Sequence, residues 1–182
     1  MKPENTTPHT RQSSSREIPS ENCETLTLLQ GPEAFAKHLQ QMLTQGRRHV
    51  EILTQQLDPL LFANADVCAA LSGLARAHRQ AEVRILIKDP KPLFGRHHPL
   101  LALQKRLTSK VNIRRLTTPP HSEHQGYVIV DQRQLLLQHQ EGEFQGFCNT
   151  DAAPEAKSLL EEFNTLWLRH AEEIVELRPL SL

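Results

Sequence analysis

A repeated alternation of strand and helix patterns is the feature that most constrains the fold. Residues 49–55 (HVEILTQ), 82–89 (EVRILIKD) and 111–116 (VNIRRL) alternate apolar and polar side chains with the period of two that is typical of β-strands. Apolar residues at helical spacing lie between them, over 65–79 and 99–107. Strands joined through helices pair in parallel, because a parallel connection needs a crossover. The sequence therefore predicts an α/β fold.

The second half of the chain adds elements that indicate antiparallel pairing. Two short apolar runs favour a hairpin that turns at Asp131-Gln132. The expected elements here are strands over 127–131, 135–138 and 144–149 and a long helix over 154–171, and a further helix is expected between Gly31-Pro32 and Gly46. A mixed sheet results from combining parallel and antiparallel strands. We therefore expect a single domain with a mixed β-sheet that is flanked by helices on both faces.

Composition sets the expected limits of this domain. Residues 1–22 are rich in Pro, Ser, Thr and charge and offer little to bury, so we expect a disordered tail followed by a domain over 23–182. Asp58-Pro59 predicts a loop over 57–64. Residues 174–180 are compatible with a closing strand or with a tail.

The cysteines and the hydropathy pattern indicate a reducing compartment. Cys23, Cys68 and Cys148 are odd in number and far apart, and their spacing matches no metal site. Cys68 lies in a helical pattern and Cys148 in a strand pattern, so both are expected to be reduced core residues. The sequence contains no apolar leader and no apolar run of about 20 residues, which predicts neither a signal peptide nor a membrane span. We therefore expect a cytoplasmic protein.

Charge is balanced overall but unevenly distributed. Lys+Arg and Asp+Glu both number 21, yet residues 76–115 hold eleven basic and two acidic residues, so the rest of the chain is net negative by nine. Such a basic section is suited to contact phosphate or nucleic acid. The alternative is an exposed face that pairs with the acidic C-terminal helix. Phe94 is the only aromatic residue interleaved with these bases, so a stacking platform for single strands is not indicated.

One short segment carries a candidate motif. Residues 124–131 (HQGYVIVD) place His124 before an apolar strand and Asp131 at its end. This spacing, in this order of strands and helices, resembles one half of the phospholipase D-like superfamily, whose signature is His-x-Lys-x-x-x-x-Asp. The resemblance covers about residues 28–167 and includes degenerate bacterial versions of the domain. Phe163 and Trp167 are similar to the aromatic pair that ends the helix following the motif.

The resemblance implies a defined chemistry, from which this sequence departs. In active members the histidine is the nucleophile, the lysine holds a phosphate oxygen, a Gly-Ser-x-Asn element helps to bind phosphate, and a second motif copy protonates the leaving group. Here Gly126 stands at the lysine position, and Gln138 and His139 stand where Gly-Ser is expected. Only one motif copy is present, so an active site would need a homodimer. Removing one preorganised donor typically costs a factor of about 10²–10³ in rate, so several losses leave little catalysis.

These departures favour a catalytically inactive phospholipase D-like domain that serves as a binding or interaction module. Its partner would be a phosphate-bearing ligand, a nucleic acid or a protein, and His124 and Asp131 would be vestigial catalytic residues. The alternative is a weak homodimeric phosphodiesterase or nuclease with His124 as nucleophile. The ligand-binding candidates are Arg96, His121, Arg114 and Arg115. Any of the three arginines could replace the missing lysine.

Simpler structural roles are also open for the motif residues. His124 could be an inert histidine at a strand start, and Asp131 could cap the amides that follow it at the turn. His121, Glu123 and His124 lie on one loop with no second cluster of ligands, so no metal site is expected. No cofactor is expected either.

Overall fold

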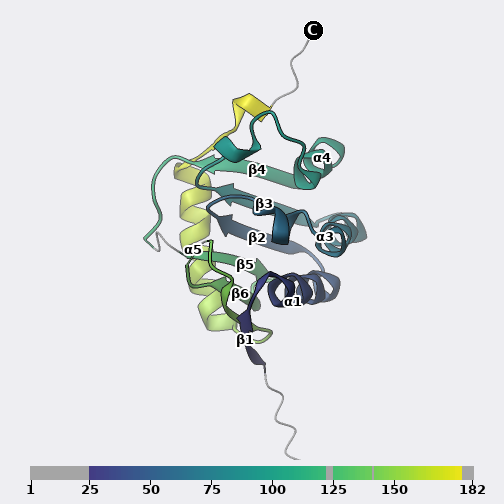
Figure 1. The fold of residues 1–182 in the computed structure, drawn as a ribbon, viewed down its shortest axis with the longest axis vertical. Helices are drawn as coiled ribbons and strands as arrows, with labels where there is room; N and C mark the ends of the chain where they lie inside the picture. The colour runs from purple at the N-terminus through teal and green to yellow at the C-terminus, as the bar shows by residue number, and fades with distance from the viewer. Residues whose placement is uncertain (1–24, 122–124, 141, 178–182) are drawn as a thin grey trace, which may run out of the picture.

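The computed structural model describes residues 25–121, 125–140 and 142–177. Within these ranges the chain forms one eight-stranded mixed sheet with helices on both faces, as Figure 1 shows. The strand order is β1-β7-β6-β5-β2-β3-β4-β8. The predicted α/β fold class is confirmed. The tail expected over 1–22 and Cys23 lie outside the described residues.

The regular elements follow the sequence patterns closely. The strands are β1 (Leu26–Gln30), β2 (His49–Thr54), β3 (Glu82–Ile87), β4 (Val111–Leu116), β5 (Gly126–Val130), β6 (Gln134–Gln138), β7 (Gln145–Asn149) and β8 (Ala171–Glu173). The helices are α1 (Pro32–Gln45), α2 (Pro59–Phe62), α3 (Ala65–Ala77), α4 (Pro99–Arg106) and α5 (Ala153–Arg169), with short 3-10 turns η1 (Lys91–Leu93) and η2 (Val175–Leu177). Each predicted strand or helix that forms has bounds within two residues of those expected.

Three elements differ from the sequence predictions. The loop expected over 57–64 contains α2, because the Asp58 carboxylate accepts the Leu60 amide at 2.9 Å and Pro59 suits a first helical turn. β1 was not predicted, because four of its five residues are exposed and no alternation marks it. The closing strand, β8, spans Ala171–Glu173 and so comes before the expected range 174–180. It pairs antiparallel with β4.

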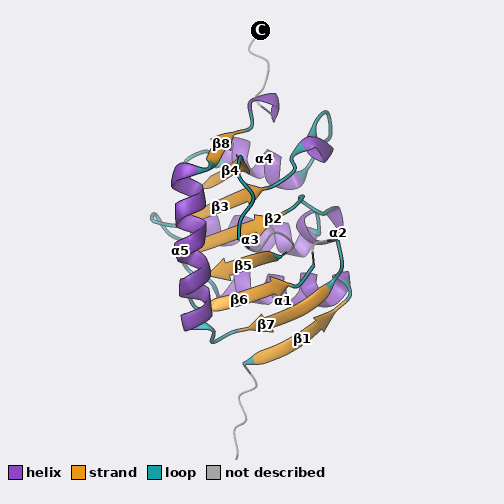
Figure 2. Cartoon of the chain, turned by 90° about the vertical axis from the view of Figure 1, so that its left-hand side faces the viewer, coloured by secondary structure: helices purple, strands orange, loops and turns teal. Residues whose placement is uncertain are grey.

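The sheet divides the core into two layers. β2, β3 and β4 pair in parallel, while β5 pairs antiparallel with β2. One face packs against α1, α3 and α4, and the other packs against α5, which crosses the strands in Figure 2. Because both faces are covered, β2 is buried at five of its six positions, and its run of apolar residues matches a central parallel strand.

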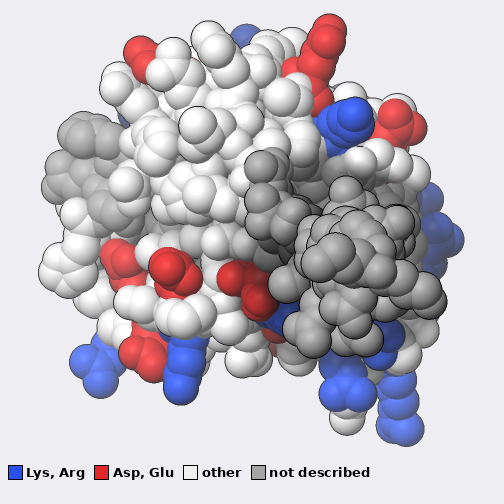
Figure 3. Space-filling model, turned by 90° about the horizontal axis from the view of Figure 1, so that it is seen from below, with Lys and Arg blue, Asp and Glu red and all other residues white. Residues whose placement is uncertain are grey.

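The edge strand β1 leaves apolar side chains in solvent. Leu26 is 51% exposed and Leu28 is 81% exposed, and no residue of β1 belongs to the core beneath α5. Figure 3 views the molecule from the end where β1 lies and shows charged side chains mostly along the margins of that face. β1 is held mainly by its antiparallel pairing with β7, which the sequence pattern of β1 alone does not reveal.

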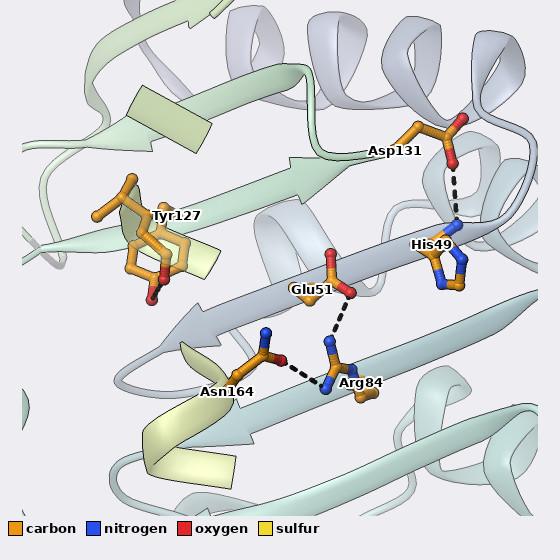
Figure 4. Close-up of polar contacts among 7 residues, drawn as sticks. His49, Glu51, Arg84, Tyr127, Asp131 and Asn164 are labelled. Carbon is orange, nitrogen blue, oxygen red and sulfur yellow. Dashed lines mark hydrogen bonds and ion pairs between the residues drawn. The ribbon is translucent and has the colours of Figure 1, made fainter. Parts of the chain in front are cut away.

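A buried ion pair links the sheet to α5. The Arg84 guanidinium donates to the Glu51 carboxylate at 2.8 Å and to the Asn164 side-chain oxygen at 2.9 Å, as Figure 4 shows. The same guanidinium lies 5.2 Å from the centre of the Phe163 ring and 5.7 Å from that of Trp167. Burial raises the pKa of Glu51, and the hydrogen bond and charge of Arg84 only partly offset this effect. The aromatic pair of α5 thus packs around a charged group.

We expect Glu51→Ala to lower the free energy of unfolding by about 3–5 kcal/mol, because it leaves the Arg84 guanidinium buried without its carboxylate. Arg84→Leu should also destabilise the fold by leaving the Glu51 carboxylate unpaired. The double variant Glu51→Ala/Arg84→Leu should lose less stability than the sum of the two single losses. Urea unfolding of the four proteins measures this coupling, and strictly additive losses would contradict it.

Candidate functional site

The motif strand β5 connects two opposite edges of the sheet. Its start lies where the parallel strands end, since Tyr127 pairs with Leu53 of β2. Its end lies where β2 begins, since Val130 pairs with Val50. Asp131 lies six positions after Gln125, which corresponds to about 20 Å along a strand. The structure therefore does not bring Asp131 to the edge at which β5 begins; Figure 4 shows Tyr127 and Asp131 well apart along the sheet.

Asp131 binds backbone amides at the junction between α1 and β2. Its carboxylate accepts hydrogen bonds from the amides of Arg47, Arg48 and His49 at 2.7, 2.9 and 2.9 Å. Asp131 and Gln132 have φ values of 51° and 60°, which form the tight turn of the predicted hairpin and are tolerated by Asp. The capped amides lie at the start of β2, whereas the sequence predicts capping of the amides that follow Asp131. Partial burial acts to raise the pKa of Asp131, but the three amide hydrogen bonds outweigh it and lower the pKa.

Asp131→Ala should lower the free energy of unfolding by about 2 kcal/mol, because three amides lose a charged acceptor. Asp131→Asn tolerates the positive φ and keeps one acceptor, so it should lose less. Because the folded pKa lies below the unfolded value of about 3.9, the contribution of the charge is fully present above that pH and is lost as pH falls through the folded pKa. The gap in stability between wild type and Asp131→Asn should therefore narrow from pH 7 to pH 3 in urea unfolding; a constant gap would contradict this role.

A pocket opens at the carboxyl ends of the parallel strands. The pairing of β2 with β3 continues beyond both strands, because the amides of Lys88 and Asp89 donate to the carbonyls of Thr54 and Gln55 at 3.0 and 2.8 Å. The pocket has a volume of about 520 Å³ and is lined by Gln55, Lys88, Leu116, Thr117, Thr118, Pro119 and Pro120. Ligands of open α/β sheets commonly bind outside the carboxyl ends of parallel strands. We refer to these seven residues as the carboxyl-edge pocket.

Lys88 links the carboxyl-edge pocket to the motif strand. Its Nζ donates to the Gln125 carbonyl at 3.0 Å, one residue before Gly126. Sequence reasoning did not single out Lys88 as a replacement for the motif lysine. The available signal was its place near the carboxyl end of the strand pattern over 82–89, an end that in a parallel sheet lies at the ligand-binding edge.

The neighbouring threonines are held by α5 and its C-terminal cap. Thr117 donates its amide and its hydroxyl to the His170 carbonyl at 2.8 and 3.0 Å. The Thr118 hydroxyl lies 3.2 Å from Nδ1 of His170. These contacts fix the backbone at one wall of the pocket and leave both residues exposed.

A second hollow at the same edge lies beneath α2. It has a volume of about 240 Å³ and is lined by Thr54, Gln55, Gln56, Asp58, Leu61, Phe62, Gln138, Gly142 and Phe144. Its lining includes the acidic residue Asp58 and no lysine or arginine. An anionic ligand is therefore better suited to the carboxyl-edge pocket, whose lining includes Lys88.

The predicted arginines occupy different surroundings. Arg96 is exposed in the loop that follows η1. The Arg114 guanidinium lies 4.4 Å from the centre of the Trp167 ring. Arg115 forms ion pairs with Glu172 of β8 at 2.7 Å and with Glu176 of η2 at 3.6 Å, so its acidic partners lie beyond the C-terminal helix that the alternative named. None of these three arginines lines the carboxyl-edge pocket.

Neither of the predicted histidines is among the residues that line the carboxyl-edge pocket. His124 lies outside the described residues. His121 is exposed, and its amide donates to the Glu162 carboxylate at 3.0 Å. Across residues 25–121, 125–140 and 142–177, no three His, Cys, Asp or Glu side chains are grouped so that they could hold a metal ion. In those same ranges no helix has the length and apolar character needed to cross a membrane.

The comparisons with known proteins identify a family and a fold. Residues 31–180 match the model of a family described as a domain of unknown function, DUF7931. No curated protein sequence matches the chain.

The fold is similar to that of TrmBL2, an archaeal chromatin protein whose structure shows a novel mode of DNA binding. The TM-score is 0.60 and the sequence identity is 16%, and the match covers 87% of this chain and 57% of TrmBL2. This chain therefore spans little more than half of TrmBL2. NucT from Helicobacter pylori is also similar, with TM-score 0.57, 14% identity and coverage of 82% of this chain and 97% of NucT.

Proposed function

The chain belongs to the DUF7931 family, and we propose that it is a phospholipase D-like domain that binds nucleic acid through its phosphates without cleaving it. The carboxyl-edge pocket is the observation that carries this proposal. It lies at the ligand-binding edge of a parallel sheet, its lining includes one cation, and the motif strand begins beside it. The fold likeness to a protein that binds DNA supports nucleic acid as the ligand class.

The surrounding surface is suited to a polyanion. Lys91, Arg96 and His97 are exposed on the loop that leaves β3 just after Lys88. Positive charges along such a loop would extend contact beyond a single phosphate, since each cation near a nucleic acid backbone releases counterions. The ligand is thus better described as a chain of phosphates than as one small anion.

The proposed absence of catalysis rests on the motif itself. Gly126 supplies no ammonium at the lysine position, and it is buried in pairing with Gln138 of β6. The Gln138 side-chain amide donates to the Glu143 carbonyl at 2.7 Å, so this group is engaged within its own hairpin. Without preorganised cations at the motif, a phosphodiester gains little transition-state stabilisation. A homodimer would bring a second copy of the same incomplete motif.

Purified protein should bind a fluorescein-labelled 20-nucleotide DNA, single-stranded or duplex, with an affinity that falls at least about tenfold between about 50 and 200 mM salt. Fluorescence anisotropy measures both the affinity and its salt dependence. Salt-independent binding, or no binding at about 50 mM salt, would point to a protein partner and overturn the proposal.

No turnover of bis-(p-nitrophenyl) phosphate or DNA above buffer is expected, and wild type and His124→Ala should be indistinguishable in this assay. The absorbance of released p-nitrophenolate and the length of recovered DNA are the two readouts. Turnover by wild type that disappears in His124→Ala would instead establish the alternative, a phosphodiesterase or nuclease with His124 as nucleophile; sedimentation would then test the homodimer that this chemistry needs.

A further inference from the structure

We propose that the edge of the sheet at which β2, β3 and β4 begin is a second surface for nucleic acid, where three arginines contact the phosphate backbone of a duplex. The residues are Arg47, Arg48 and Arg79, which we call the amino-edge arginines. The inference goes beyond the proposed function, whose pocket lies at the opposite edge, and each can fail without the other. The observation behind it is that the loops leading into the three parallel strands meet at one edge and carry basic residues without an acidic one.

Three loops that join a helix to a parallel strand form this edge. They are residues 46–48 before β2, 78–81 before β3 and 107–110 before β4, with the sequences GRR, HRQA and LTSK. β2, β3 and β4 run in the same direction across Figure 2, so their starts lie side by side. The Glu82 amide donates to the Arg48 carbonyl at 2.7 Å. The Val83 amide likewise donates to the Lys110 carbonyl at 2.7 Å. The three loops therefore form one continuous, positively charged margin of the sheet.

The guanidinium groups of the amino-edge arginines are open to solvent. All three residues are exposed, and no ion pair within the parts of the chain that the structure describes involves any of them. The neighbouring Asp131 carboxylate accepts the backbone amides of Arg47 and Arg48 rather than their side chains. Figure 4 shows this carboxylate at the start of β2. The positive charges of the three side chains are therefore available to a ligand.

Other basic residues of the same edge have structural partners. Nε of Arg76 donates to the Ser72 carbonyl at 3.2 Å in the last turn of α3, where a cation stabilises the helix end. The Lys110 ammonium donates to the His78 carbonyl at 3.0 Å and also to the Arg79 carbonyl, so it joins two of the loops. These contacts fix the backbone that carries the amino-edge arginines.

A nucleic acid backbone suits this edge better than a protein surface does. The large apolar side chains that are exposed in the described chain all lie outside the three loops: they are Leu26, Leu28, Leu60, Leu168 and Val175. Protein interfaces have an apolar centre, whereas nucleic acid interfaces are polar and positively charged. Planar guanidinium groups match phosphate oxygens, and adjacent strands about 4.8 Å apart spread them over more than one phosphate. The loops contain no aromatic residue, so the contacts are with phosphates and not with stacked bases.

Two surfaces on opposite edges allow one domain to hold two duplexes. β2 has six residues, which places its two ends about 20 Å apart. A duplex that lies against the carboxyl-edge pocket therefore leaves the amino-edge arginines open to a second duplex. The domain then bridges two DNA segments.

The test compares Arg48→Gln/Arg79→Gln with Lys37→Gln/Lys157→Gln, which removes two positive charges from exposed lysines of α1 and α5 outside the three loops. Beads carry a biotinylated duplex of about 20 base pairs, and the captured amount of a second, fluorescein-labelled duplex is measured at about 0.1 M salt. Wild type and the lysine variant should capture the second duplex, and the arginine variant should capture at least about fivefold less, because it loses two phosphate contacts. In fluorescence anisotropy the arginine variant should still bind one duplex. Urea unfolding checks that each variant is folded.

The remaining outcomes separate this inference from the proposed function. If the arginine variant binds and captures DNA as wild type does, the amino-edge surface is overturned and the proposed function stands. If the arginine variant fails to bind even one duplex, the carboxyl-edge pocket fails as the binding site and the amino-edge arginines stand as the surface for nucleic acid. If no DNA binds to any of the proteins, both are overturned. Labelled polyglutamate that binds through Arg48 and Arg79 where DNA does not would identify an acidic protein as the partner and would also overturn the inference.

Discussion

The antiparallel pairing of β5 with β2 is the interaction on which the arrangement of this domain depends. It attaches the motif strand to the edge of the parallel group β2-β3-β4 and fixes its register through Tyr127 and Leu53. The start of β5 consequently lies where the parallel strands end, and its end lies where β2 begins. This register places Gln125 and Asp131 at opposite edges of the sheet, so the two ends of the motif have different neighbours and different roles.

The two ends also differ in electrostatic character. At one end, the Asp131 carboxylate meets three backbone amides, an arrangement that stabilises the junction of α1 with β2. At the other end, the Lys88 ammonium meets a backbone carbonyl and faces a pocket walled by hydroxyl and amide groups. Between them, Glu51 and Arg84 form a buried pair under α5. Of these charged groups, Lys88 is the one that lines a pocket large enough for a ligand.

The sequence predicted the elements well where local patterns control them and poorly where distant partners do. β3 and α1 follow from alternation and helical spacing, which report local burial. β1 could not be predicted, because its hydrogen bonds go to β7, more than a hundred residues away in the chain. The sequence offers Arg96, Arg114 and Arg115 as replacement cations, whereas the carboxyl-edge pocket is lined by Lys88. Only strand register reveals which basic residue lies beside Gln125.

The sequence by itself determined the α/β class, the mixed sheet, the hairpin at Asp131-Gln132 and the absence of a lysine from the motif, because periodicity and residue identity are properties of neighbours in the chain. The tertiary structure alone decided that Asp131 binds amides at 47–49 and that Arg115 pairs with Glu172. It also decided that Lys88 reaches the backbone of the motif strand. The physical reason is that a hydrogen bond or an ion pair depends on distance in space, and the sheet brings together residues whose separation in the chain carries no information about that distance.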